Sequence, residues 1–124
     1  MTTVVDASAV LAWLQDEPGA DAAEPMLMNG VIGAANWSEV LQKSRQHGVE
    51  PGAVAMLLMS FGLDVADVTS DDAEVAAGMW RSGSGLSLGD RLCLALGLRL
   101  GVAVATADSR WASLSRGPQV TVIR

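Results

Sequence analysis

Short β-branched segments alternate with longer helical segments along the chain, and this alternation limits the possible folds more than any other feature. The first β-branched segment, 2–5, ends at Asp6, and from Ala7 onward the apolar residues follow helical spacing. Neighbouring parallel strands need a connection that crosses the sheet, which is usually a helix. The alternation therefore predicts an α/β domain whose mainly parallel sheet is covered by helices on both faces.

The other elements are predicted from hydrophobic periodicity and from glycine, proline and capping residues. Pro25 is expected to interrupt the second helix, and Thr69 or Ser70 to cap the fifth. Residues 31–33 form only a brief apolar segment, and the loop 82–85 is expected to be mobile. We expect helices at 7–14, 19–28, 36–47, 53–61, 71–81 and 88–100, and further strands at 63–68, 102–106 and 120–123.

The length of the chain indicates a single domain over residues 1–124. Half of its 124 residues are apolar, which is enough for one hydrophobic core. The longest apolar stretches, 53–59 and 92–98, are much shorter than the roughly 20 residues of a membrane helix. Asp6 also interrupts the N-terminal apolar segment before it could serve as a signal peptide. We therefore expect a cytoplasmic protein that makes no contact with the membrane.

The formal charge of −6 argues against a broad basic surface for nucleic acid. Four of the fourteen acidic residues are candidate metal ligands, however, and two divalent cations would change the charge from −6 to −2. One histidine and one cysteine leave little material for a histidine- or cysteine-rich metal site. A local positive rim could still form from Lys43, Arg45, Arg81, Arg91 and Arg110.

Two of the candidate acids, Asp6 and Asp108, follow predicted strands directly or by two residues. In parallel sheets, ligands bind beyond the carboxyl ends of the strands, where the strand order reverses. Each residue also has a simpler explanation, because an aspartate before a helix often caps it. Both explanations remain open at this point.

The other two candidates, Glu39 and Asp90, lie on predicted helices. Glu39 is opposite the apolar stripe of its helix, so it faces either solvent or a polar cleft beside Asn36 and Lys43. Asp90 lies in the first helical turn, where the helix dipole alone could stabilise it. The rest of that helix is so apolar that it should be buried, and a buried carboxylate needs a cation or hydrogen-bond donors.

A shared ligand would explain all four acids at once, provided that the fold brings them together. Hard divalent cations such as magnesium and manganese take oxygen ligands and keep several waters. The sequence therefore suggests a site for one or two Mg²⁺ or Mn²⁺ ions, held by Asp6, Glu39, Asp90 and Asp108.

Four local sequences occur in the order and spacing seen in PIN-domain toxins of the VapC family, which the chain resembles over nearly its whole length. The four are VVDASA at 4–9, NWSEV at 36–40, LSLGDRLCLA at 86–95 and TADSRW at 106–111. The resemblance implies a PIN-like three-layer sandwich with a five-stranded, mostly parallel sheet flanked by helices. It also implies that the four acids are catalytic metal ligands. The resemblance also places Ser8, Asn36 and Thr106 in supporting positions near these ligands.

The function implied by the resemblance is that of a metal-dependent endoribonuclease, the toxin of a type II toxin–antitoxin system. Such an enzyme hydrolyses RNA phosphodiester bonds to 5′-phosphate and 3′-hydroxyl ends. The implied partners are RNA, a cognate antitoxin that covers the acidic cleft, and a second copy of the chain. Met56 and Met59 are expected to pack in the core, although the apolar face of 53–61 could serve dimerisation instead.

Two other functions remain as alternatives. The same fold could bind RNA or protein without cleaving anything. A phosphatase or receiver-like domain could use Asp6 as a nucleophile, but such domains usually carry a second aspartate where this chain has Ser8.

Overall fold

Five short strands and six α-helices make up the fold in the computed structural model, which describes residues 2–124. All strand pairs are parallel, and the strand order is β3-β2-β1-β4-β5. Within the described residues, no helix has the length and apolar character needed to cross a membrane. The elements in chain order are β1 (Val4–Val5), α1 (Ala7–Leu14), α2 (Ala20–Leu27), β2 (Val31–Gly33), α3 (Ala34–Gln46), α4 (Pro51–Ser60), β3 (Asp64–Ala66), α5 (Ser70–Gly78), α6 (Leu88–Leu100), β4 (Val104–Thr106), the 3-10 helix η1 (Ser109–Ser113) and β5 (Val120–Val122).

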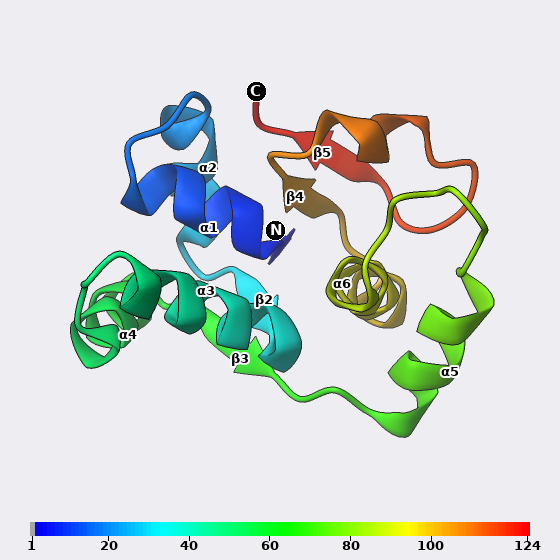
Figure 1. The fold of residues 1–124 in the computed structure, drawn as a ribbon, viewed down its shortest axis with the longest axis horizontal. Coiled ribbons are helices and arrows are strands. Elements are labelled where there is room, and N and C mark those ends of the chain that lie inside the picture. The colour runs from blue at the N-terminus through cyan, green and yellow to red at the C-terminus, as the bar shows by residue number, and fades with distance from the viewer. Residues whose placement is uncertain (1) are drawn as a thin grey trace.

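Helices cover both faces of the sheet, so the fold has three layers (Figure 1). Helices α1 to α4 lie on one face, and α5 and α6 lie on the other. Consecutive residues of β1 show this division, because successive strand side chains point to opposite faces. Val5 belongs to the core cluster that contains Val10 and Leu27, whereas Val4 belongs to the cluster with Leu94. The predicted α/β sandwich with a parallel five-stranded sheet is confirmed.

The strand order reverses at β1, and this reversal positions the candidate site. From β1 the chain builds outward through β2 to β3, and then returns through α5 and α6 to place β4 on the other side of β1. Side chains at the carboxyl ends of β1 and β4 therefore border a crevice between diverging connections. Asp6 follows β1 directly, and Thr106 is the last residue of β4.

The prediction that Pro25 interrupts the second helix is wrong, because α2 continues through it to Leu27. Proline removes one backbone donor, which leaves the carbonyl of Asp21 without its helical partner. Both Asp21 and Pro25 are exposed, so water can hydrogen-bond that carbonyl. The predicted cap of α5 is confirmed as Thr69.

The prediction that Met56 and Met59 pack in the core is also wrong. Their side chains are 76% and 58% exposed, whereas Val54 and Leu58 bury the inner face of α4. These two buried residues are one helical turn apart, so they lie on the same side of the helix. An apolar surface on α4 is therefore left open.

Gly97 allows α6 to lie close against β4. A Cβ atom added at Gly97 would lie 2.4 Å from Val104 Cγ2 and 3.0 Å from Pro118 Cγ. We therefore expect Gly97→Ala to lower the free energy of unfolding by about 1–3 kcal/mol, because the helix must shift to admit the methyl group. Urea denaturation measures this loss.

Gly78→Ala is the matched control, since a Cβ at Gly78 would meet no heavy atom within 4 Å. Alanine is also the better helix former, so this variant should be at least as stable as the wild type. An unchanged urea midpoint for Gly97→Ala would contradict the close packing of α6 on the sheet.

Candidate active site

Asp6 is a buried carboxylate fixed by two hydroxyl groups. Its Oδ2 accepts hydrogen bonds from Ser8 Oγ at 2.6 Å and from Thr106 Oγ1 at 3.1 Å. The side chain does not cap α1, although Asp6 is the N-cap residue by backbone position. The capping explanation is therefore wrong for this carboxylate. Its other oxygen, Oδ1, accepts no hydrogen bond from residues 2–124.

Glu39 is a half-buried residue of α3 that is held by Asn36, one helical turn earlier. The buried amide of Asn36 donates from Nδ2 to Glu39 Oε1 at 3.0 Å and to the carbonyl of Gly89 at 3.1 Å. The bond to Gly89 joins α3 to the first turn of α6. Glu39 therefore faces the polar junction between the two helices, and its Oε2 receives no hydrogen bond from the described residues.

Asp90 begins α6 as part of a capping box with Ser87. Asp90 Oδ2 accepts from the Ser87 backbone N–H at 2.9 Å, and the Asp90 N–H donates to Ser87 Oγ at 3.1 Å. The helix-start explanation is thus correct for one carboxylate oxygen. Sequence reasoning missed Ser87, although serine three residues before an acid is a recognisable capping signal. Within residues 2–124, Asp90 Oδ1 has no hydrogen-bond partner.

Asp108 caps η1 and pairs with Arg110. Its Oδ1 accepts from the Arg110 backbone N–H at 3.0 Å, and its Oδ2 lies 2.7 Å from Arg110 Nη2. The guanidinium of Arg110 therefore holds the pKa of Asp108 below its ordinary value. The backbone N–H of Asp108 donates to Thr106 Oγ1 at 3.1 Å, which links this residue to the hydroxyl that also binds Asp6.

Asp6, Glu39 and Asp90 lie close enough to affect one another electrostatically. Burial raises the pKa of Asp6 above its ordinary value, and the charge of Asp90 raises it further. Burial, then repulsion from Asp6 and Asp90, raises the pKa of Glu39. The buried thiol of Cys93 experiences all three charges, which add to the effect of burial in raising its pKa. Each of the three carboxylates therefore lies within electrostatic range of the other two.

These three carboxylates fit a hard divalent cation by charge and by donor type. Within residues 2–124, none of the three forms an ion pair with lysine, arginine or histidine. Each has one oxygen held by a neighbour, and the other accepts no side-chain hydrogen bond from the part of the chain that the structure describes. Uncompensated negative charges destabilise a buried site, and oxygen is the donor that magnesium and manganese prefer.

The side chains do not yet enclose a single coordination point. Among the described residues, no group of three or more aspartate, glutamate, histidine or cysteine side chains is already arranged to hold an ion. Of the four predicted acids, Asp6, Glu39 and Asp90 influence one another electrostatically, whereas Asp108 is held in an ion pair with Arg110.

Comparisons with known proteins support the same fold. The sequence model of the PIN domain matches residues 3–117. A chain of a toxin–antitoxin complex from Klebsiella pneumoniae has a TM-score of 0.80 at 17% identity and covers 98% of each chain. A VapC toxin from Mycobacterium tuberculosis, described as cleaving the sarcin–ricin loop, has a TM-score of 0.71 at 17% identity, with 95% of this chain and 100% of that chain covered. A chain of a DNA-bound VapBC complex from Salmonella typhimurium has a TM-score of 0.72 at 13% identity over 100% of both chains. A search of curated proteins gave no match.

Proposed function

Because the chain belongs to the PIN-domain family, we propose that it is a metal-dependent endoribonuclease and the toxin of a type II toxin–antitoxin system. The observation that carries this proposal is the group of Asp6, Glu39 and Asp90 at the reversal point of the sheet. Each of them has one carboxylate oxygen that accepts no side-chain hydrogen bond from residues 2–124. A module that only bound RNA would be hindered by such a concentration of negative charge, because carboxylates repel phosphate oxygens unless a cation lies between them.

In the proposed site, Asp6, Glu39 and Asp90 hold one or two Mg²⁺ or Mn²⁺ ions. When bound, such an ion activates water and stabilises charge on a phosphodiester. Asp108 is the proposed fourth ligand, and its ion pair with Arg110 must open before it can bind an ion. Arg110 is then free to contact a substrate phosphate.

The supporting residues orient these carboxylates. Ser8 and Thr106 hold Asp6 Oδ2, which directs the other oxygen of Asp6 toward the site. Asn36 does the same for Glu39. Fixed orientation matters because loss of the groups that position metal ligands typically lowers metal affinity or activity by about 10–100-fold.

The proposed partners are RNA, a cognate antitoxin and a second copy of the chain, all in the cytoplasm. The Klebsiella pneumoniae neighbour is a toxin–antitoxin complex, which supports an antitoxin for this chain. The exposed apolar side chains of α4 support a dimer contact, because large apolar surfaces of soluble proteins commonly mark interfaces. These are Met56, Leu57 and Met59.

The proposed activity can be tested by sequencing RNA ends from cells that express the chain. We expect new 5′-phosphate ends at recurrent positions, and none with the Asp90→Asn variant. If Asp90→Asn inhibits growth as strongly as the wild type and the RNA ends do not change, the chain is a binding module instead.

Gly89 offers a way to separate activity from stability. A Cβ at Gly89 would lie 2.6 Å from Glu39 Oε1, so alanine must displace that carboxylate. We expect Gly89→Ala to reduce RNA cleavage by about 10–100-fold, as for other groups that position metal ligands. The melting temperature should not fall, because alanine favours the helix and the end of the Glu39 side chain can move. Wild-type activity in Gly89→Ala would show that the position of Glu39 is unimportant.

The raised pKa of Asp6 predicts how the stability of the metal-free protein depends on pH. Its carboxyl group binds a proton more tightly in the folded than in the unfolded chain. The stabilisation that Asp6 contributes is therefore fully present at pH values below the pKa of its carboxyl group in the unfolded chain. It is lost as the pH rises through the pKa of the same group in the folded chain. Cation affinity should rise over the same interval, because protons and cations compete for the same oxygens.

Asp6→Asn isolates this contribution from those of other groups, such as Asp108, whose lowered pKa has the opposite effect. The melting temperatures of the wild type and of Asp6→Asn are compared in the presence of a chelator. As the pH rises above the ordinary pKa of an aspartate, the melting temperature of the wild type should fall relative to that of Asp6→Asn. Parallel curves for the two proteins would contradict the raised pKa of Asp6.

A further inference from the structure

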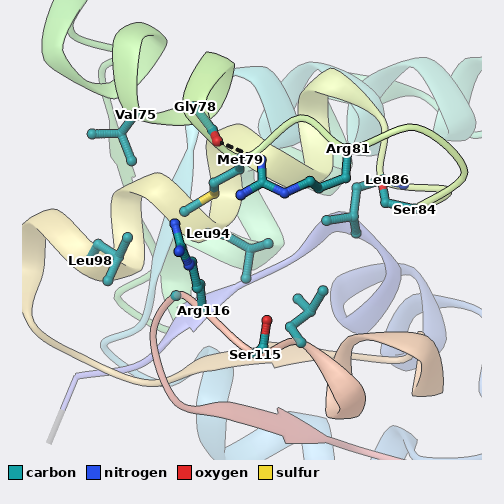
Figure 2. Close-up of a pocket in the computed structure, with 12 residues that line it drawn as sticks. Val75, Gly78, Met79, Arg81, Ser84, Leu86, Leu94, Leu98, Ser115 and Arg116 are labelled. Carbon is teal, nitrogen blue, oxygen red and sulfur yellow. Dashed lines mark hydrogen bonds between the residues drawn. The ribbon is translucent and has the colours of Figure 1, made fainter.

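An apolar pocket that contains two arginines lies between α5, α6 and the segment that follows η1 (Figure 2). Its volume is about 290 Å³, close to the lower end of the range for small-molecule sites. The loop that leads to Asp90 supplies part of its wall through Ser84 and Leu86. The principal apolar side chains are Val75, Met79, Leu94, Leu98 and Leu114.

The charge of this pocket is opposite to that of the protein. The chain has 14 acidic and 8 basic residues, yet none of the lining residues is acidic. Arg81 donates to the backbone carbonyls of Gly78 and Trp80, at 3.2 and 2.9 Å. Within residues 2–124, neither Arg81 nor Arg116 forms an ion pair. Both side chains project into the pocket (Figure 2), so their positive charges are left for an anionic ligand.

A nucleotide combines the two properties that this pocket selects, a phosphate and a flat apolar ring. Planar guanidinium groups bind phosphate oxygens in pairs and also stack on bases. The leucine and methionine side chains provide apolar surface for the face of a base. An inorganic anion would use the arginines but not this apolar floor.

The pocket is also close to the proposed cleavage site along α6. Leu94 lies one helical turn after Asp90, which corresponds to about 6 Å along the helix axis. Arg110 lies beside the loop whose residues Ser84 and Leu86 line the pocket, since a Cβ at Gly85 would be 2.9 Å from Arg110 Nη1. A strand that leaves the carboxylate site can therefore pass Arg110 and reach Arg81 and Arg116.

We infer that this pocket binds a nucleotide of the RNA strand next to the cleaved bond, with its phosphate between Arg81 and Arg116 and its base against Met79 and Leu98. The inference rests on the proposed ribonuclease function and adds a second point of substrate contact to it. Such a contact fixes the register of the strand at the carboxylates.

The test measures binding of a fluorescently labelled single-stranded RNA of mixed sequence to the full-length Asp6→Asn protein, by fluorescence anisotropy at several salt concentrations. In this background we expect Arg81→Ala and Arg116→Ala each to weaken binding severalfold. Each should also reduce the slope of log affinity against log salt by about 0.7, the value for one phosphate contact on a single strand. Adenosine 5′-monophosphate should displace the RNA at lower concentration than inorganic phosphate does.

Arg124→Ala is the matched control, because Arg124 is an exposed arginine that contacts Glu17 and the carbonyl of Pro18 and does not line the pocket. It should leave both affinity and slope unchanged. Leu98→Asp should weaken binding most, since it places a carboxylate in the pocket at a side chain that is already 44% exposed. Melting curves of all variants verify that they are folded.

The inference is overturned if Arg81→Ala and Arg116→Ala bind RNA as Arg124→Ala does. It is also overturned if, in the same anisotropy assay with a labelled acidic peptide, the two variants lose binding of the peptide but not of RNA. Cleavage of the same RNA by the wild type is measured separately. A wild type that cleaves RNA while the pocket variants bind normally contradicts the pocket alone. A wild type that does not cleave contradicts the proposed nuclease.

Discussion

Asp6→Asn and Asp90→Asn should each reduce the rate of RNA cleavage by at least about a hundredfold, beyond the loss typical for groups that only position metal ligands. Asparagine retains the shape of the side chain but lacks the negative charge that holds a cation. In Asp6→Asn, the side-chain amide oxygen can still accept the hydrogen bonds from Ser8 and Thr106 that Asp6 Oδ2 accepts now. The fold should therefore persist, and initial rates on a defined RNA measure the loss.

The melting temperature gives this expectation a second, independent readout. Burial and the charge of Asp90 disfavour the charged form of Asp6, so Asp6→Asn should be at least as stable as the wild type without metal. Asp64→Asn is the matched control, because it makes the same chemical change at an exposed carboxylate on β3. Cleavage at the wild-type rate by Asp6→Asn would rule out the carboxylate site as the source of activity.

Removal of divalent cations should abolish cleavage, and their return should both restore it and stabilise the protein. A ligand that binds only the folded state raises the free energy of unfolding by about 2.7 kcal/mol at a concentration of 100 times its Kd. The gain is expected here because a cation offsets the repulsion among Asp6, Glu39 and Asp90. Thermal unfolding across a magnesium or manganese titration, with RNA cleavage assayed in parallel, measures both effects.

The same titration with Asp90→Asn provides the control for nonspecific cation effects. This variant should show a much smaller gain in melting temperature than the wild type. Equal stabilisation of the two proteins, or full cleavage activity in chelator, would contradict a cation site at these carboxylates.

The sequence was most informative about the long elements of the fold. Helix α6 occupies the predicted residues because Gly101 ends it in the left-handed conformation, at φ 67°, which glycine adopts without strain. Strand β2 has only three residues, too few for an alternating pattern, so the sequence showed no more than an apolar segment there. Helix α4 is apolar on several faces, and periodicity alone did not show that Met56 and Met59 point outward.

For the candidate site, the sequence supplied candidate acids but not the hydrogen bonds that their oxygens accept. The order of the motifs and the ends of the strands led to Asp6 and Asp108. Which of them caps a helix depends on side-chain conformations, and these are set by distant neighbours such as Thr106. The ion pair of Asp108 with Arg110 is similarly a choice among local partners. The pocket with Arg81 and Arg116 combines segments that only the tertiary structure brings together.

A crystal structure of the protein with Mn²⁺, in which an anomalous difference map locates the metal, tests the central claim most directly. We expect an anomalous peak at the start of α6, with direct oxygen contacts from Asp6 and Asp90 and a direct or water-mediated contact from Glu39. A structure with Mn²⁺ elsewhere, and with these three carboxylates turned away from one another, would contradict the proposed site.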